Sequence, residues 1–123
     1  MMSKDIELFE LCKEVSRRTT WEGTGYWWHE TEYERGDVEI EQSTHKSDLR
    51  YTKSYPLYTS DYVLEKLGNY LELKHFGNSY DVTQYVDASM FSGSSDTPIK
   101  ALLKLTIALC DAGELTNTDK ENV

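Results

Sequence analysis

Hydrophobic residues near the C-terminus recur at three- and four-residue steps, the spacing of one face of a helix. The stripe consists of Leu102, Leu105 and Leu109, flanked by Leu103, Ile107 and Cys110. The expected solvent side carries Lys100, Lys104 and Asp111. An apolar arc this wide predicts a helix that is mostly buried against the rest of the chain.

The ends of this helix carry start and stop signals. Pro98 suits the first helical position, directly after Thr97 or Asp96 as the capping residue. Gly113 can adopt the left-handed conformation that ends a helix. We therefore expect a helix from about residue 98 to 112. The Ser- and Gly-rich segment 87–96 before it is expected to be a flexible connector.

Two further helices are indicated earlier in the chain. In residues 4–17, apolar side chains recur every three residues, and two arginines stand at the negative end of the helix dipole. A shorter helix is predicted to start at Thr59 or Ser60, which can cap it, and to end at Gly68.

Between the helices the apolar period changes to two, which is typical of strands. One hairpin is predicted from residues 26–34 and 38–42, around the turn 35–37. A second is predicted from residues 70–76 and 80–86, around the turn 77–79. Residues 49–54 form a weaker candidate for a third strand in the first half of the chain.

These elements predict an α+β fold in a single domain, residues 1–123, with frayed ends at 1–3 and 116–123. We expect one antiparallel sheet of four to five strands, covered by three helices in an α-β-α sandwich. The expected order is α-β-β-(β)-α-β-β-α. The length suffices for one hydrophobic core.

Two short motifs resemble a known family. The segment PLYTSDYVLEKLG, residues 56–68, and the segment DTPIKALLKLTIAL, residues 96–109, look like the small phage and prophage proteins of the phage ABA-sandwich domain family. The resemblance implies a sheet between helical layers and a phage origin. It implies no catalytic residues, because none are known for the family. The hairpin at 26–42 is not part of the family pattern.

The chain is acidic, with a formal net charge of −9 and a pI of about 4.7. Residues 21–43 alone carry −6 of this charge. The basic footprint of a nucleic-acid-binding protein is absent, so we expect no direct binding to nucleic acid. An acidic balance favours solubility or a basic partner.

The cellular setting is expected to be the cytoplasm. Cys12 and Cys110 both lie on apolar helical faces, which favours buried thiols in a reducing compartment over a disulfide. The charged N-terminus does not resemble a signal peptide, and no apolar run is long enough to cross a membrane. If the protein is phage-encoded, the host cytoplasm is its expected location.

The first hairpin is the strongest candidate for a binding surface. Carboxylates two residues apart on a strand lie roughly 6.6 Å apart on one face, and such an array could engage a basic protein surface. The alternatives are a solvated edge hairpin whose charges prevent aggregation, or a divalent-metal site. The predicted partner-binding residues are Trp27, Trp28, Glu30, Glu32, Glu34, Asp37, Glu39 and Glu41.

The aromatic residues of this region allow two interpretations. They are Trp21, Tyr26, Trp27, Trp28 and Tyr33. Aromatics on both faces of a strand are all buried only if both faces are covered, which would make them core. Otherwise they are anchors of a protein interface, in which Trp and Tyr are enriched.

A second candidate site would bind a small ligand or nucleotide without catalysis. The segment 92–97 precedes a helix N-terminus, where backbone amides can hold an anion. The ligand-binding residues of this alternative are Arg50, Lys53, Ser94, Ser95 and Thr97. The segment lacks the Lys-Ser/Thr of a phosphate-binding loop.

No pattern indicates catalysis, a metal or a cofactor, and we do not expect an enzyme. His29, His45 and His75 are scattered and lack metal-ligand spacing with either cysteine. We expect an accessory protein that binds a host protein with a basic surface. A host nuclease or defence complex is a natural target, and the hairpin would then mimic DNA. A homodimer through exposed aromatics would serve the same end.

Overall fold

The computed structural model describes residues 6–34, 36–46, 52–68, 71–86 and 88–114. Its three helices are α1 (Ile6–Arg18), α2 (Ser60–Leu67) and α3 (Pro98–Asp111). Its six strands are β1 (Trp27–Glu32), β2 (Val38–Ser43), β3 (Thr52–Pro56), β4 (Leu71–Phe76), β5 (Ser79–Val86) and β6 (Ser89–Ser95). The fold is α+β, as predicted.

The strands form two antiparallel sheets, each of three strands. Sheet A has the order β2-β1-β3, and sheet B has the order β4-β5-β6. The predicted single sheet of four to five strands is therefore wrong. So is the predicted order, because a third strand follows the second hairpin.

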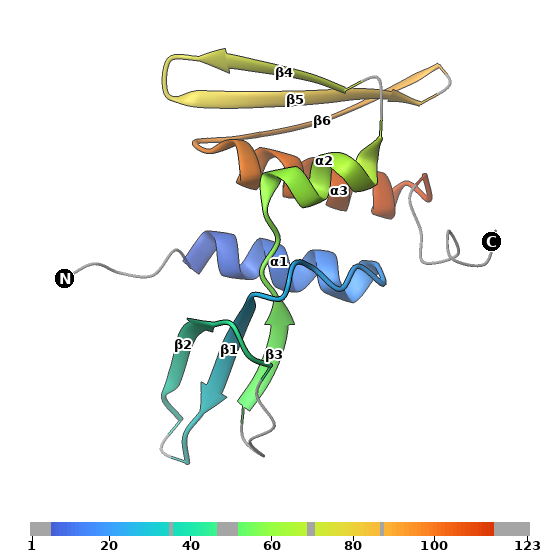
Figure 1. Cartoon of the computed structure of the whole chain (residues 1–123). Coiled ribbons are helices and arrows are strands. Elements are labelled where there is room, and N and C mark those ends of the chain that lie inside the picture. The colour runs from blue at the N-terminus through green and yellow to red at the C-terminus, as the bar shows by residue number, and fades with distance from the viewer. Residues whose placement is uncertain (1–5, 35, 47–51, 69–70, 87, 115–123) are drawn as a thin grey trace.

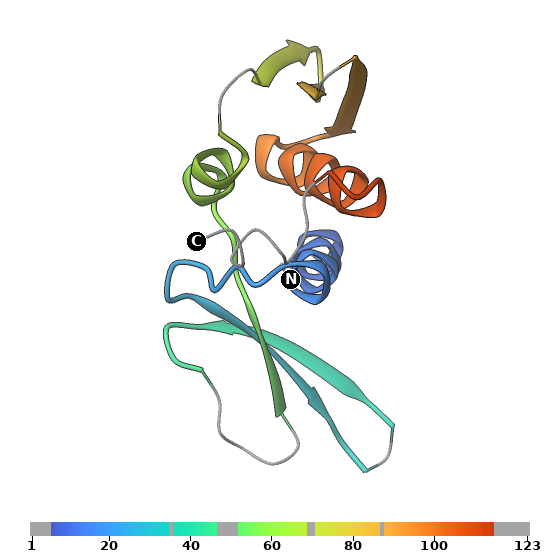
Figure 2. The same cartoon turned by 90° about the vertical axis from the view of Figure 1, so that its right-hand side faces the viewer.

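The three helices lie between the two sheets (Figures 1 and 2). Helix α3 packs under sheet B, chiefly against β6 and β5, and α1 lies between α3 and sheet A. The layering is thus the reverse of the expected α-β-α sandwich. One face of each sheet meets the helices, and none of the described helices or strands covers the other face.

The predicted helix boundaries are close to those observed. Helix α3 begins at Pro98, and the Thr97 side chain accepts a hydrogen bond from the Lys100 amide. Helix α2 is capped in the same way by Thr59, whose side chain accepts from the Tyr62 amide. Both caps satisfy amides that the first helical turn leaves without partners. The predicted frayed ends, residues 1–3 and 116–123, lie outside the described residues.

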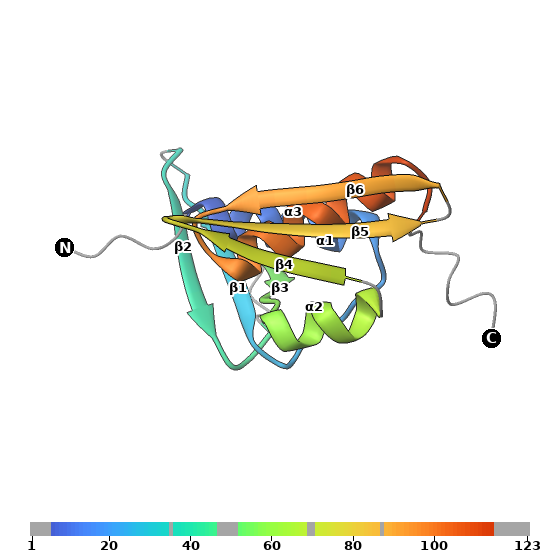
Figure 3. The same cartoon turned by 90° about the horizontal axis from the view of Figure 1, so that it is seen from above.

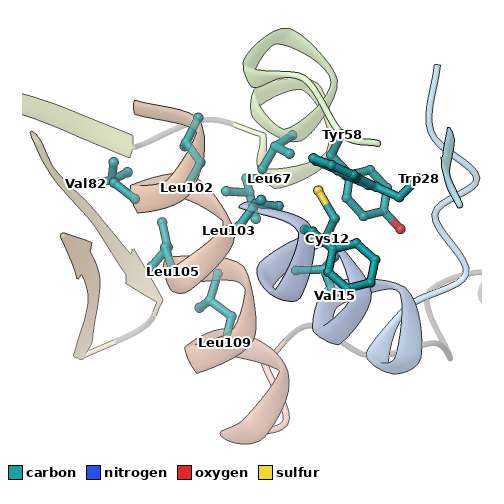
Figure 4. Close-up of a cluster of buried hydrophobic side chains, with 13 residues drawn as sticks. Cys12, Val15, Trp28, Tyr58, Leu67, Val82, Leu102, Leu103, Leu105 and Leu109 are labelled. Carbon is teal, nitrogen blue, oxygen red and sulfur yellow. The ribbon is translucent and has the colours of Figure 1, made fainter. Parts of the chain in front are cut away.

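One buried cluster joins all the layers. It includes Phe9, Cys12 and Val15 of α1, Trp28 of β1, Tyr58, Val63 and Leu67 around α2, Val82 of β5, and the apolar residues of α3. In Figure 4, Leu102 and Leu105 lie on the side of Val82, whereas Leu103 points toward Cys12 and Leu67. Helix α3 therefore packs against sheet B on one side and against α1 and α2 on the other.

The side of α3 that was expected to face solvent is partly covered. Lys100 is only 6 % exposed, because α1 lies beside it. Its ammonium forms ion pairs with Glu7 at 3.2 Å and with Asp96 at 3.3 Å. The hydrogen bond from Lys100 lowers the pKa of the Asp96 carboxyl. The prediction that Lys100 is exposed to solvent is therefore wrong, while Asp111 is exposed as predicted.

The segment predicted as a flexible connector is strand β6. Its Gly93 is buried and lies opposite Val82 of β5. A Cβ atom on Gly93 would come within 2.4 Å of the Ala101 carbonyl oxygen and 2.5 Å of the Leu105 amide nitrogen. The strand can therefore touch the backbone of α3 only because residue 93 has no side chain.

We predict that Gly93→Ala destabilises the protein by about 3 kcal/mol or more, since the added methyl group meets backbone atoms that cannot move aside. Urea unfolding followed by circular dichroism measures the change. The control is Ser94→Ala on the exposed side of the same strand, which should cost no more than about 0.5 kcal/mol. Equal midpoints for the two variants would contradict the close packing of β6 on α3.

A second prediction concerns Tyr58, which is buried and donates a hydrogen bond to the Trp21 carbonyl at 2.9 Å. Burial raises the pKa of the Tyr58 hydroxyl above its ordinary value of about 10. A folded-state pKa that is raised contributes stability below pH 10, and this contribution is lost as the pH rises above that value.

Tyr58→Phe should therefore cost about 1 kcal/mol at pH 7, for the lost hydrogen bond. The difference from the wild type should shrink at pH 11, because phenylalanine has no proton to lose. Urea unfolding at both pH values measures this. Tyr85 is exposed, so Tyr85→Phe is the control and should leave the stability unchanged from the wild type at both pH 7 and pH 11. A difference that is the same at pH 7 and pH 11 would show that Tyr58 does not resist ionisation.

Candidate partner-binding surface

The first predicted hairpin is present as β1 and β2. The two strands pair in antiparallel register, with Glu30 opposite Ile40 and Glu32 opposite Val38. Backbone hydrogen bonds between Tyr33 and Asp37 and between Gly36 and Tyr33 close the turn, both at 2.8 Å. Gly36 has a φ of 93°, a conformation that favours glycine.

The weaker third-strand candidate is also a strand, shifted toward the C-terminus. As β3 it pairs with the other edge of β1, so that Trp28 lies opposite Tyr55 and Glu30 opposite Lys53. Residues 49–51 of the predicted strand lie outside the described residues. Strand β1 is therefore the centre of sheet A, and β2 and β3 are its edges.

The register places the carboxylates of the two strands on opposite faces. Side chains that lie directly across an antiparallel pair share a face. Glu30 and Glu32 of β1 share the helix-facing side with Trp28, whereas Glu39 and Glu41 of β2 share the outer side with Thr31 and His29. The six carboxylates thus do not form one flat array.

The helix-facing side of β1 belongs to the core. Trp28 is fully buried, and its ring meets that of Phe9 edge-on at a centroid distance of 5.5 Å. Its indole N–H has no hydrogen-bond acceptor among the described residues. Trp28 was predicted to contact a partner, but it is not accessible for one. The core interpretation of the aromatic residues is therefore correct for this residue.

Glu30 is also withdrawn from the surface. It pairs with Lys13 of α1 at 3.3 Å, and the two side chains are only 21 % and 15 % exposed. The same ammonium lies 5.6 Å from the Phe9 ring centroid and 5.4 Å from that of Tyr55. Glu30 therefore ties sheet A to α1 and does not contribute to an outward acidic surface.

No described element covers the outer face of sheet A, and the residues on this face are mainly polar (Figure 1). Trp27 lies on it half-buried, with the Lys46 ammonium 5.4 Å from its ring centroid. His29 Nε2 lies 2.6 Å from the His45 carbonyl oxygen, and Thr31 and Thr52 share a hydrogen bond across the strands. Trp27 is thus accessible from solvent only in part.

The turn end of the hairpin, which lies away from the helices in Figure 2, retains an exposed cluster that we call the acidic tip. The acidic tip consists of Glu32, Tyr33, Glu34, Asp37, Val38, Glu39 and Glu41, all exposed. Tyr33 and Val38 are 41 % and 51 % exposed, although the valine side chain is apolar and the tyrosine ring largely so. The Tyr33 hydroxyl donates a hydrogen bond to Glu39 at 2.9 Å and orients that carboxylate.

The residues of the alternative ligand site are not brought together. Lys53 lies in sheet A, whereas Ser94 and Ser95 lie in β6 of sheet B, on the other side of the helices (Figure 1). The Ser94 carbonyl accepts from Lys104 at 3.2 Å, and Thr97 caps α3. Arg50 lies outside the described residues. The described members of this set therefore cannot line one pocket.

The described residues contain no group of three or more His, Cys, Asp or Glu side chains that could hold a metal ion. His75 lies in sheet B, far from the acidic tip, and stacks flat on Tyr80 at a centroid distance of 4.3 Å. Cys12 is buried and Cys110 half-buried, and the two are not joined by a disulfide. In the part of the chain that the structure describes, no helix is long and apolar enough to cross a membrane.

Comparison of the chain with protein-family models, with curated proteins and with solved structures finds no match. The resemblance to the phage ABA-sandwich family therefore stays a prediction. The arguments below rest on the geometry of the chain itself.

Sequence reasoning missed the Lys13–Glu30 pair. A signal was present, because Lys13 stands directly after Cys12 and four residues after Phe9, beside the apolar face of α1. A long basic side chain at such a position can lay its stem along the core and direct its charge to a neighbouring element. The pairing with one particular glutamate could be read only from the sheet register.

We predict that Glu30→Ala lowers the stability by about 1 kcal/mol, because it leaves the half-buried Lys13 ammonium without its carboxylate. Glu41→Ala on the exposed face of the same hairpin is the matched control, with an expected change within about 0.5 kcal/mol. Thermal unfolding of both variants measures this. If the two variants unfold at the same temperature, Glu30 has no structural role.

Proposed function

We propose that the protein acts by binding another protein through the acidic tip. The observation that supports this is the composition of the tip, in which one hairpin end carries five exposed carboxylates together with an exposed tyrosine and an exposed valine. Exposed aromatic and aliphatic side chains provide contact area, and the surrounding carboxylates select a basic partner.

The partner that fits this surface is a protein with a basic groove or patch. The carboxylates raise the local negative potential and speed association with such a surface. Nucleic acid would be repelled, because its phosphates carry the same sign of charge. Basic grooves are typical of nucleic-acid-handling proteins, so the protein is a candidate inhibitor that occupies such a groove as a DNA mimic.

The resemblance to phage proteins adds a biological setting to this proposal. In that setting the partner is a nucleic-acid-handling or defence protein of the bacterial host. The function is binding without catalysis. The alternative of a sequestering domain for a small ligand has lost its main support, because Lys53 and the Ser94–Thr97 segment lie on opposite sides of the helices.

The proposal is tested by reversing charges on the acidic tip while leaving Glu30 intact. The variant Glu32→Lys, Glu39→Lys, Glu41→Lys should bind the partner at least about tenfold more weakly, because attraction to a basic surface becomes repulsion. The matched control is Glu10→Lys, Glu22→Lys, Glu65→Lys, which makes the same change in net charge at exposed positions elsewhere.

The measurement is capture from a bacterial lysate at low and high salt, followed by binding assays with the purified partner. We expect the wild type and the control variant to capture a nucleic-acid-binding protein in a salt-sensitive manner. The wild type should also compete with nucleic acid for that protein. If the tip variant binds as well as the control variant, the acidic tip is not the contact surface.

A further inference from the structure

Two sheets of three strands each leave four strand edges, and these edges differ in how well they are protected. The edges are β2 and β3 in sheet A and β4 and β6 in sheet B. An edge strand presents unpaired backbone amides and carbonyls, which can pair with another strand. Natural proteins protect such edges with charges, prolines or covering elements.

Three of the four edges carry such protection. On β2, a symmetric pairing about Ile40 would place Glu39 opposite Glu41 of a second copy, and like charges repel. Strand β3 is short and ends at Pro56. Strand β4 carries Glu72 and Lys74, and α2 lies one layer below it and beyond its edge (Figures 2 and 3).

Strand β6 carries no charge or proline of its own, and among the described residues only the Lys104 side chain bonds to its outer edge. Its seven residues, SMFSGSS, include no charge and no proline. Its residues Met90, Ser92 and Ser94 are exposed, Met90 by 61 %. Figures 2 and 3 show α3 beneath β5 and β6, one layer below the strands, with its C-terminal turn reaching the side of the β6 edge.

The backbone groups of β6 that point outward follow from the register. Phe76 and Ser79 flank a two-residue turn and therefore form a hydrogen-bonded pair, and such pairs recur at every second position. On β5, Tyr80 and Val82 then face β6, where they lie opposite Ser95 and Gly93.

The backbones of Met90, Ser92 and Ser94 accordingly face the open edge. The Ser94 carbonyl confirms this direction, because it accepts a hydrogen bond from the Lys104 ammonium at 3.2 Å. The same ammonium also pairs with Glu7 at 3.3 Å, so it keeps a partner when another donor replaces it on the Ser94 carbonyl.

We propose that two copies of this chain pair through β6, as antiparallel strands related by a two-fold axis at Ser92. In this register Ser92 faces Ser92 of the second copy, and the outward amides and carbonyls of Met90 and Ser94 bond to one another. On the inner face, this register places Phe91 opposite Gly93 of the second copy. The two copies of sheet B become one six-stranded sheet.

A second copy fits this edge better than an unrelated strand does, because the edge is complementary to itself. The isologous pairing needs no charge partner, because the strand itself carries no charge that would repel its copy. Sheet A lies on the far side of the helices from sheet B, so both acidic tips would point to the same side of the dimer (Figure 1). The dimer does not depend on the proposed function, but it would present that surface twice.

The test places like charges on the two-fold axis. Ser92 is exposed, so Ser92→Lys and Ser92→Glu should both fold, and each should be monomeric because two equal charges oppose one another. An equimolar mixture of the two variants should form a heterodimer, since Lys then faces Glu. Analytical ultracentrifugation measures the masses, and circular dichroism verifies folding.

The matched control is Thr83→Lys. Thr83 is the neighbour of Ser92 across the ladder on the same outer face, but it lies on the central strand β5. This variant should dimerise like the wild type. At an ionic strength near 0.15 M, where charges beyond roughly 8 Å are screened, we expect the dissociation constant of each Ser92 variant to rise at least about tenfold.

The outcomes discriminate clearly. A wild-type chain that stays monomeric up to millimolar concentration overturns the proposal. So does a dimer that survives Ser92→Lys, or a mixture of the two charged variants that remains monomeric. Failure of the acidic-tip variant to lose its partner would leave these masses unchanged, so the two proposals fail separately.

Discussion

The structure depends on the close contact between strand β6 and helix α3. Gly93 brings the strand onto the backbone of α3, and this contact turns a serine-rich segment into the third strand of sheet B. With sheet B above it and α1 below it, α3 is enclosed on two sides (Figure 2). Its wide apolar arc, and the ion pairs that accompany the buried Lys100, are consequences of this position.

The helices and both hairpins could be predicted from the sequence because their signals are local. Caps, prolines and apolar periods act within a few residues, and α2 and α3 begin as predicted. The layering could not be predicted in this way. An apolar stripe shows that a helix is buried but not which elements cover it, and β6 has none of the β-branched residues that indicate a strand. The need for Gly93 appears only when the strand is seen against α3.

The candidate surface, too, could be predicted from the sequence only in part. The density of carboxylates in residues 26–42 is visible in the sequence, but the face to which each one points depends on the register between β1 and β2. In that register Trp28 lies in the core and Glu30 pairs with Lys13, so that only the residues of the acidic tip remain exposed as a carboxylate cluster. Adjacent residues of one strand therefore have different roles, since one half of β1 is held by α1 and the other half extends beyond it.

The charges of the hairpin have two consequences that do not exclude one another. Glu39 and Glu41 make the β2 edge unsuitable for pairing with itself, while their exposure keeps them available to a basic surface. Edge protection requires only like charge along the strand, so a change of both residues to lysine would preserve it. Partner binding depends on the sign of the charge. The protective and recognition roles of these carboxylates can therefore be separated by charge reversal, which leaves the first intact and removes the second.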